Sequence, residues 1–542
     1  MRPARTAAAL LGWAVLSLVV AAANSAEGGA ARPPQPLVLT REGRVLGVRT
    51  SFEGRPLHAF YGVPYARPPL GRLRFLPPVP VTSWRHVWSA RRFKGPCMQR
   101  LDEVHYPVHL KMLQNASEDC LYLNVWTAVP DQQKVTSGTV LKPVVVILHG
   151  GVFSFGNTGS LLYDGSALAA LGNVTVVSMN FRLGVFGFLD AMNRQAPGNV
   201  GLLDQRMALL WVRRNIQAFG GDPEKVTLLG LSSGAASGGL HMTSPQSRGL
   251  FHAAILEGGG PLCDAFVEPS RRSLERANHL AGLLSCSRMG AELGNLPGQA
   301  SSASVLACLR SRPAEDLLWA QERVASSSLS SFVATYGNSF LPKSPWKSKY
   351  LPVPLLIGTS SNEGSPFVAR RCFEQPPRLF AEWHAKGGQP VFVYKFCYAT
   401  SSLYVPEWMG VPHSSTFWYM SGVPLRMPER FHEVDRTLSR EMVRVVAHFA
   451  AQRQGSGGLH GPAVGADVQR LLAGHAPASA PGRRTKGRTL IVLPVLEFPG
   501  SLSVCPCTLR YYHAGHGPFE HWQASRSLQN PVTTRTPLHL EL

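Results

Sequence analysis

The chain has 542 residues, which exceeds one ordinary domain but suits a single large α/β domain followed by a tail. Its formal net charge is +21, and such a charge can mark nucleic-acid binding. The basic residues are mostly scattered arginines, however, and no nucleic-acid-binding motif accompanies the densest cluster, at 483–488. Binding of nucleic acid as the main function is therefore disfavoured, and we expect no nucleic-acid partner.

The N-terminal segment has the features of a secretory signal peptide. Arg2 and Arg5 precede an apolar stretch at 7–23, and small residues follow near Ala26. No later segment supplies the roughly 20 uninterrupted apolar residues that a membrane span needs. We therefore expect a signal peptide at 1–26 and a secreted mature protein without a transmembrane segment.

Nine cysteines in a secreted chain predict disulfides, and the odd number leaves at least one thiol outside them. Two Asn-x-Ser/Thr sequences, at Asn115 and Asn173, are predicted glycosylation sites. Asn115 lies in a polar, loop-like stretch. Asn173 opens an apolar, strand-like run, and the pattern leaves open whether it is buried.

Apolar runs alternate with amphipathic segments along the chain. The sequence predicts a hairpin at 37–50, buried strands at 144–148, 174–179, 226–229, 355–358 and 391–394, and helices at 203–219 and 440–452. This alternation predicts an α/β fold, a mostly parallel sheet with helices on both faces. Residues 454–488 are rich in Gly, Ala, Pro and Arg. We therefore divide the chain into one domain, 27–452, and a divergent tail, 453–542.

The segment Gly230-Leu231-Ser232-Ser233-Gly234 joins the strand at 226–229 to a run of small residues. Glycines two residues either side of Ser232 permit a sharp turn from strand to helix, because side chains there would collide. Such a turn presents the serine hydroxyl at the N-terminus of the helix. We interpret Ser232 as a nucleophile.

A serine hydroxyl is a weak nucleophile at neutral pH and needs a base, an orienting carboxylate and an anion-binding pocket. The glycine-containing loop 149–153 follows a buried strand, and its backbone amides, with that of Ser233, are candidates for the pocket. Glu363 follows the strand at 355–357, and His413 lies in a later loop, so that the chain order is Ser, Glu, His. This chemistry requires no metal and no cofactor, and we expect none.

Together with several further segments, these motifs resemble those of the type-B carboxylesterases, and especially the cholinesterase branch of that family. The additional matching segments are 60–66, 118–126, 199–206, 219–223 and 406–410. The resemblance covers residues 37–452 and implies an α/β-hydrolase fold. It also implies a serine esterase that acts on a small-molecule carboxylic ester.

The resemblance assigns roles residue by residue. It implies Ser232 as nucleophile, Glu363 as orienting acid, His413 as base, oxyanion donors at Gly151, Val152 and Ser233, and an ion pair between Arg182 and Glu118. It also implies the disulfides Cys97–Cys120 and Cys286–Cys308, and a third bridge from Cys372 to a partner near the C-terminus, where Cys505 or Cys507 could serve. Cys263 and Cys397 have no evident partner.

Two departures from the family pattern concern catalytic competence. Val152 replaces the third glycine of the usual loop, and a β-branched residue resists unusual backbone angles. Loss of one oxyanion donor would lower turnover by a factor on the order of 10²–10³. The segment between Phe367 and Cys372 is several dozen residues shorter than in the family.

Other departures concern the substrate. No tryptophan lies between Cys97 and Cys120, although the choline site of the family uses one. Acidic residues of that site are replaced by Leu231 and Thr416, and the aromatic residues that narrow the acyl pocket by Ser328 and Ser330. These changes favour neutral esters over choline esters.

Three interpretations remain open at this point. The first is a secreted serine esterase that acts on neutral esters, and the second, within the same class, is an acetylcholinesterase. The third is a catalytically impaired member of the family that serves as an adhesion or binding protein. No assembly helix of the cholinesterase type is recognisable near the C-terminus, so no oligomeric state is predicted.

Overall fold

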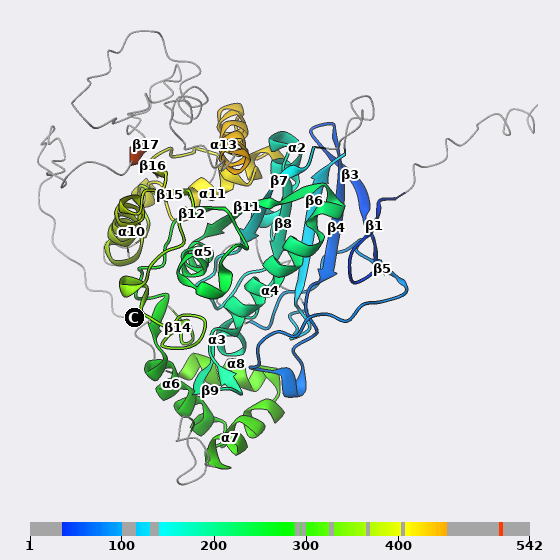
Figure 1. Cartoon of the computed structure of the whole chain (residues 1–542). Helices are drawn as coiled ribbons and strands as arrows, with labels where there is room; N and C mark the ends of the chain where they lie inside the picture. The colour runs from blue at the N-terminus through cyan, green and yellow to red at the C-terminus, as the bar shows by residue number, and fades with distance from the viewer. Residues whose placement is uncertain are drawn as a thin grey trace, which may run out of the picture.

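The computed structural model describes residues 35–99, 115–129, 140–287, 293, 300–324, 330–364, 369–402, 407–452 and 509–512. These residues build a ten-stranded sheet in the order β17-β16-β15-β12-β11-β7-β8-β6-β4-β3, with helices on both faces (Figure 1). Its strands are β3 (Val48–Phe52), β4 (Arg55–Pro64), β6 (Tyr122–Ala128), β7 (Lys142–Leu148), β8 (Thr175–Met179), β11 (Gly221–Leu231), β12 (Ala253–Glu257), β15 (Leu355–Ser360), β16 (Val391–Phe396) and β17 (Leu509–Tyr512).

Smaller elements surround this sheet. The short strands are β1 (Leu37–Leu39), β2 (Arg44–Leu46), β5 (Val87–Ser89), β9 (Asp190–Asn193), β10 (Ala196–Pro197), β13 (Val267–Pro269) and β14 (Ala334–Tyr336). The helices are α2 (Ser166–Gly172), α3 (Gly184–Phe188), α4 (Val200–Asn215), α5 (Ser233–Thr243), α6 (Ser270–Leu283), α7 (Ala300–Ser311), α8 (Ala314–Arg323), α10 (Gln375–Lys386), α11 (Ser415–Met420), α12 (Val423–Arg426) and α13 (Glu433–Ala451).

The centre of the sheet is parallel, as the alternation of strands and helices predicts. β8, β7, β11, β12, β15 and β16 pair in parallel, whereas β3, β4 and β6 form an antiparallel end. Parallel strands are covered on both faces and therefore read as continuous apolar runs. The run at 144–148 is such a strand. Because the six central strands are parallel, their carboxyl ends lie along the same edge of the sheet.

Each central strand contributes to two separate cores. In β7, Val144 and Val146 pack with Trp211 of α4 on one face, while Val145 and Ile147 pack on the other face among residues of α2 and α13. Side chains of a strand alternate between faces, so one apolar run fills both cores. Figure 1 shows α4 and α5 on one side of the sheet and α2, α11 and α13 on the other.

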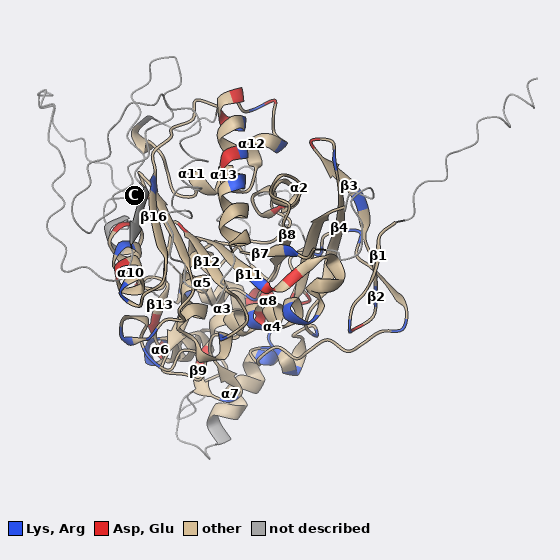
Figure 2. Cartoon of the chain, turned by 45° about the horizontal axis from the view of Figure 1, so that its top comes forward, with Lys and Arg blue, Asp and Glu red and all other residues tan. Residues whose placement is uncertain are grey.

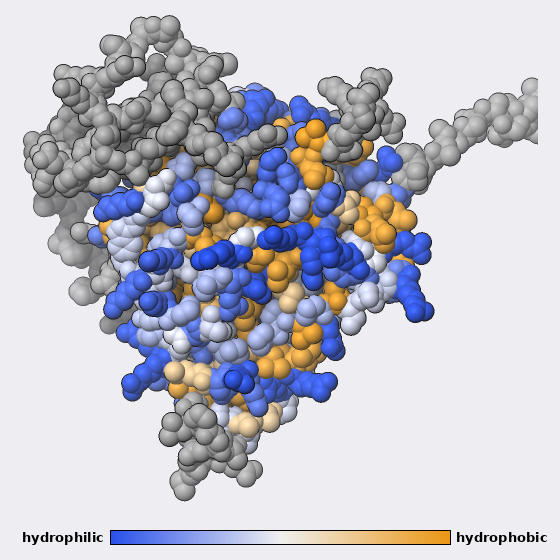
Figure 3. Space-filling view, in the orientation of Figure 1, coloured by the Kyte–Doolittle hydropathy of each residue, from blue (hydrophilic) through white to orange (hydrophobic). Residues whose placement is uncertain are grey.

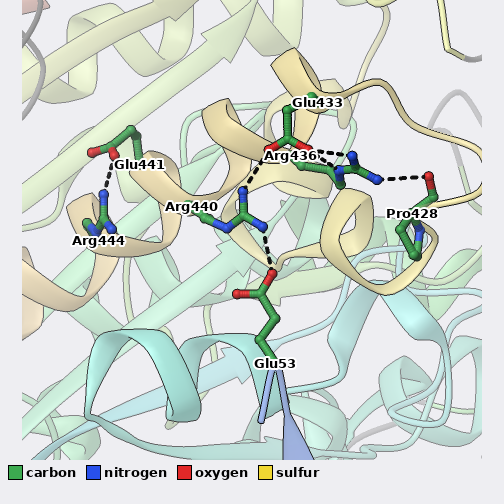
Figure 4. Close-up of polar contacts among 7 residues, drawn as sticks. All are labelled: Glu53, Pro428, Glu433, Arg436, Arg440, Glu441 and Arg444. Carbon is green, nitrogen blue, oxygen red and sulfur yellow. Dashed lines mark hydrogen bonds and ion pairs between the residues drawn. The ribbon is translucent and has the colours of Figure 1, made fainter. Parts of the chain in front are cut away.

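Helix α13 carries a charged outer surface over its buried face. Arg440 contacts Glu53 of the β3–β4 hairpin at 2.9 Å and Glu433 at 3.1 Å (Figure 4). Arg436 also contacts Glu433, and Arg444 contacts Glu441. Because these pairs are open to solvent, they contribute little to stability. The helix is held mainly by its apolar face.

Charge and hydropathy are mixed over the surface. Figure 2 shows Lys and Arg scattered over α6, α10 and α13, with Asp and Glu between them. The face shown in Figure 3 is largely hydrophilic, and apolar residues occupy small groups between polar ones. Within the described ranges, no helix is both long enough and apolar enough to cross a membrane.

Three disulfides join described cysteines. Cys97–Cys120 and Cys286–Cys308 are the two pairs that the resemblance implies. The third bridge joins Cys372 to Cys263, 109 residues earlier, with a Cα–Cα distance of 4.5 Å. The expectation of a partner near the C-terminus was therefore wrong, because Cys372 lies beside Cys263, in the segment that follows β12. Cys397 is buried, with its sulfur 3.9 Å from the Lys395 carbonyl oxygen.

The predicted elements are all present, with shifted ends. The hairpin at 37–50 contains the antiparallel pair β1–β2, the helix at 440–452 begins earlier, at Glu433, and the helix at 203–219 begins at Val200 and ends in a 3₁₀ segment, Ile216–Phe219. Asn115 and Asn173 are both exposed, and Asn173 caps the C-terminus of α2 with φ 51°. Strand β17 lies within the segment assigned to the tail; the predicted signal peptide, Cys505 and Cys507 lie outside the described residues.

Candidate active site

Ser232 occupies a sharp turn between β11 and α5. Its φ is 57°, in the left-handed region, and its side chain is largely buried, with 6% of the residue exposed. The Ser232 N–H donates to the Glu257 carbonyl oxygen at 2.8 Å. A Cβ on Gly234 would collide with the Leu148 carbonyl oxygen, so the turn requires glycine there. This is the strained strand-to-helix turn that the sequence predicts.

Glu363 and His413 meet beyond the ends of β15 and β16. Glu363 follows β15, and its carboxylate accepts the Ser360 N–H at 2.5 Å. Its other oxygen contacts His413 Nδ1. Glu363 is 1% exposed, while His413 packs its ring on Phe373 at a centroid distance of 4.6 Å. A buried carboxylate on Nδ1 fixes the orientation of the imidazole.

Two adjacent glycines lie between Ser232 and His413. A Cβ on Gly258 would lie 3.0 Å from His413 Cε1, and one on Gly259 would collide with the Ser232 carbonyl oxygen. Ser232 and His413 therefore flank the same dipeptide. The structure forms no hydrogen bond between these two described side chains. Catalytic hydrogen bonds are often long before substrate binds.

The loop after β7 presents backbone N–H groups beside the turn. Gly151 has φ 116° and Val152 has φ 47°. The Phe153 N–H donates to Ser233 Oγ at 3.3 Å, which ties the loop to α5. Among the described residues, the N–H groups of Gly151, Val152 and Ser233 have no hydrogen-bond acceptor. Such N–H groups at a helix N-terminus are suited to binding an oxyanion.

Buried aromatic and polar contacts support this loop from below. Tyr163 Oη accepts the Gly150 N–H at 2.9 Å. His149 stacks on Phe181 with ring centroids 4.2 Å apart, and its Nδ1 lies 2.9 Å from the Gly150 carbonyl oxygen. Burial lowers the pKa of His149 to about 4, so that the ring is neutral at neutral pH. Ser330, which the resemblance places in the acyl pocket, lies 2.5 Å from the Ser154 hydroxyl, while Ser328 is outside the described residues.

The expected ion pair between Arg182 and Glu118 was wrong. Asp204 of α4 holds the Arg182 guanidinium with both oxygens, at 2.8 and 2.7 Å. Glu118 instead pairs with Arg74 at 2.5 Å. Asp204 is fully buried next to Arg182 and accepts hydrogen bonds from its Nε and Nη2, so Glu118 pairs with a different arginine.

Sequence reasoning missed Glu257, although its side chain lies next to Glu363. Glu257 ends β12, is fully buried, and accepts a hydrogen bond from the Tyr394 hydroxyl. Burial, reinforced by the nearby Glu363, raises the pKa of Glu257 to about 8. A glutamate at the end of the apolar strand 253–257 was the only signal in the sequence. Within the described ranges, no group of three or more His, Cys, Asp or Glu is placed to hold a metal ion.

A parallel sheet with a serine in a strained strand-to-helix turn and an acid–histidine pair after later strands defines the α/β-hydrolase class. The chain belongs to the carboxylesterase family, whose sequence model matches residues 34–375 and 369–463. The acetylcholinesterase of Bungarus fasciatus is 32% identical over 488 residues, which cover 76% of this chain and 78% of that protein. The cholinesterase of Mus musculus is 32% identical over 489 residues, with the same two coverages. These comparisons support the class of serine carboxylic-ester hydrolases.

Proposed function

We propose that this protein hydrolyses carboxylic esters through an acyl-enzyme on Ser232. The observation that carries the proposal is the contact between Glu363 and His413 beside the turn that holds Ser232. A serine at such a turn becomes a strong nucleophile only when a base lies within reach and is itself oriented. Membership of the carboxylesterase family supports the same chemistry.

In the proposed mechanism, Ser232 Oγ attacks the ester carbonyl carbon while His413 Nε2 takes the hydroxyl proton. Glu363 holds Nδ1 and stabilises the imidazolium that forms. His413 then gives the proton to the leaving alcohol, and the acyl group stays on Ser232. Water, deprotonated by His413, releases the acid in a second cycle of the same steps.

The oxyanion of each tetrahedral intermediate is assigned to the N–H groups of Gly151, Val152 and Ser233. Their lack of another acceptor among the described residues supports this assignment. Donors that are already oriented stabilise developing charge without reorganisation, and one such donor is worth about 3–4 kcal/mol.

We propose neutral esters as the substrates. A choline ester needs a cation-binding aromatic face and acidic neighbours. The chain has no tryptophan between Cys97 and Cys120, and it has Leu231 and Thr416 at positions where the family has acids. The names of the two relatives, an acetylcholinesterase and a cholinesterase, favour choline esters as the competing substrates. A comparison of acetyl- and butyrylcholine with uncharged esters of the same acyl groups decides between the two substrate classes.

We also propose secretion after removal of residues 1–26, glycosylation at Asn115 and Asn173, and a catalytic domain at 27–452 followed by the tail 453–542. Exposure of both asparagines and three disulfides are compatible with an extracellular protein.

One observation favours a second candidate, a catalytically impaired binding protein. Val152 holds φ 47°, a conformation that is costly for a β-branched residue, within the loop assigned to the oxyanion. If the loop relaxes in solution, an oxyanion donor is lost, and turnover falls on the order of 10²–10³.

The deciding experiment is labelling of the secreted protein with a fluorophosphonate, beside Ser232→Ala. We expect labelling of the wild type and none of the variant, together with ester hydrolysis that falls by a factor on the order of 10⁴ or more in the variant. A folded wild-type protein that refuses the label overturns the esterase and supports the binding protein.

A further inference from the structure

The end of β12 brings a second carboxyl group to the site. Glu257 contacts the nucleophile through its backbone, because its carbonyl oxygen accepts the Ser232 N–H at 2.8 Å. Its side chain is fully buried near the carboxylate of Glu363. No step of the proposed mechanism uses this group, and a buried carboxyl without a cationic partner is costly to ionise.

A path across three strands fixes the Glu257 side chain. Tyr394 of β16 pairs in register with Gly358 of β15, which pairs in turn with Glu257 of β12. A Cβ on Gly358 would collide with the Tyr394 ring, so this glycine lets the ring cross the strand. The Tyr394 hydroxyl thereby reaches Glu257 and donates to its Oε2. The Thr416 hydroxyl is the other hydrogen-bonding group that faces the Glu257 carboxyl.

The groups around Glu257 carry no positive charge that would favour its ionised form. β11 contributes Leu231 in register, α11 contributes the Thr416 hydroxyl, and the loop after β15 contributes Glu363, behind which His413 lies. On β16, Tyr394 is the titratable group that faces Glu257, and burial raises its pKa, whereas Lys395, the next residue, is exposed. Burial first, and Glu363 second, raise the pKa of Glu257, while the hydrogen bonds from Tyr394 and Thr416 lower it.

We propose that Glu257 is a positioning residue of the esterase site: its buried carboxyl, held by the Tyr394 hydroxyl, adds a second negative charge behind His413 when it ionises. The inference rests on the proposed function. Because the imidazolium of His413 forms in the transition state, a further negative charge behind it lowers the barrier. The neutral form keeps Glu363 as the one anion that orients His413.

The test is the pH dependence of kcat/KM for an uncharged ester between pH 5 and 10. We expect kcat/KM of the wild type to rise near pH 8 by about two- to tenfold, the effect of one added charge inside a protein. Glu257→Gln has nearly the same shape but no proton to lose, and should lack this rise. Tyr394→Phe removes a hydrogen bond that favours ionisation of Glu257 and should move the rise to higher pH.

A second readout is independent of turnover. An unfolded chain releases the Glu257 proton near pH 4.5, whereas the folded chain keeps it to about pH 8, so the unfolded state binds fewer protons across this window. Glu257 therefore lowers the stability progressively as pH rises from 4.5 to 8. We expect the Tm of Glu257→Gln to exceed that of the wild type by a margin that grows over this window.

The outcomes separate this inference from the proposed function. A wild type that is folded but takes no fluorophosphonate overturns the proposed function and, with it, the catalytic part of the inference. An active wild type whose pH profile matches that of Glu257→Gln overturns the inference alone. A constant difference in Tm between Glu257→Gln and the wild type from pH 5 to 8 would contradict the inference that Glu257 keeps its proton in the folded state.

Discussion

The proposed nucleophile and the proposed acid–base pair are held in different ways. Ser232 sits in a continuous strand, turn and helix, and the loop 149–153 beside it follows the neighbouring strand β7. Glu363 and His413 lie on two loops joined by contacts distant in sequence, such as the hydrogen bond from Asn362 N–H to the Val411 carbonyl oxygen at 3.0 Å. The first region depends on local backbone geometry, and the second on tertiary contacts. Divergence of sequence should therefore affect the second region first.

Replacement of Glu363 should have the largest effect, and it should disturb the Glu363–His413 pair while leaving the turn at Ser232 intact. Glu363→Gln keeps the size of the side chain but cannot hold Nδ1–H of His413 as a carboxylate does. We expect kcat to fall by a factor on the order of 10⁴. Steady-state kinetics with an uncharged ester measures this loss. A loss below tenfold would mean that His413 is oriented by other contacts.

The third disulfide offers a sharper comparison of the two regions. Cys263–Cys372 places Phe373 against the His413 ring, whereas Cys286–Cys308 closes a loop between α6 and α7. Chain entropy assigns about 5 kcal/mol to the longer loop and about 3 kcal/mol to the shorter one. Both double Cys→Ser variants should lower Tm.

At a temperature where both variants remain folded, only Cys263→Ser/Cys372→Ser should lose activity, by about tenfold, as His413 loses the support of Phe373. Circular dichroism establishes folding and ester hydrolysis gives the rate. Equal activity losses in the two variants would show that the Cys263–Cys372 bridge has no special role in supporting His413.

Substitution of Val152, in the loop 149–153 beside Ser232, should have the smallest effect of these changes. A β-branched residue at φ 47° costs roughly 1–2 kcal/mol more than glycine. Val152→Gly should relieve this strain and raise kcat up to about tenfold, because the loop holds its N–H groups in place more often. Val152→Ala keeps a Cβ and should give a smaller gain. A lower kcat in Val152→Gly would show that the valine side chain itself supports the site.

The contrast between the two regions also explains what the sequence could predict. The turn at Ser232 was predictable because its glycines and its preceding strand are contiguous. Glu363 and His413 were found by their place after strands and by resemblance to a family. The partner of Cys372 was not, because a bridge across 109 residues leaves no local pattern. Glu257 was missed for a similar reason: its neighbours Tyr394 and Thr416 come from elements that only the folded sheet brings together.

Strand β17 gives the C-terminal segment a structural consequence. It pairs antiparallel with β16 from Val391 to Tyr394 and lies at the end of the ten-stranded sheet. Without residues 509–512, the main-chain N–H and C=O groups of β16 would face solvent, and such an edge invites strands from other molecules. By pairing with β16, residues 509–512 cover that edge and become the outer strand themselves. A chain cut after α13 would keep the turn at Ser232 but would expose the unpaired edge of β16, beside Tyr394, to strands of other molecules.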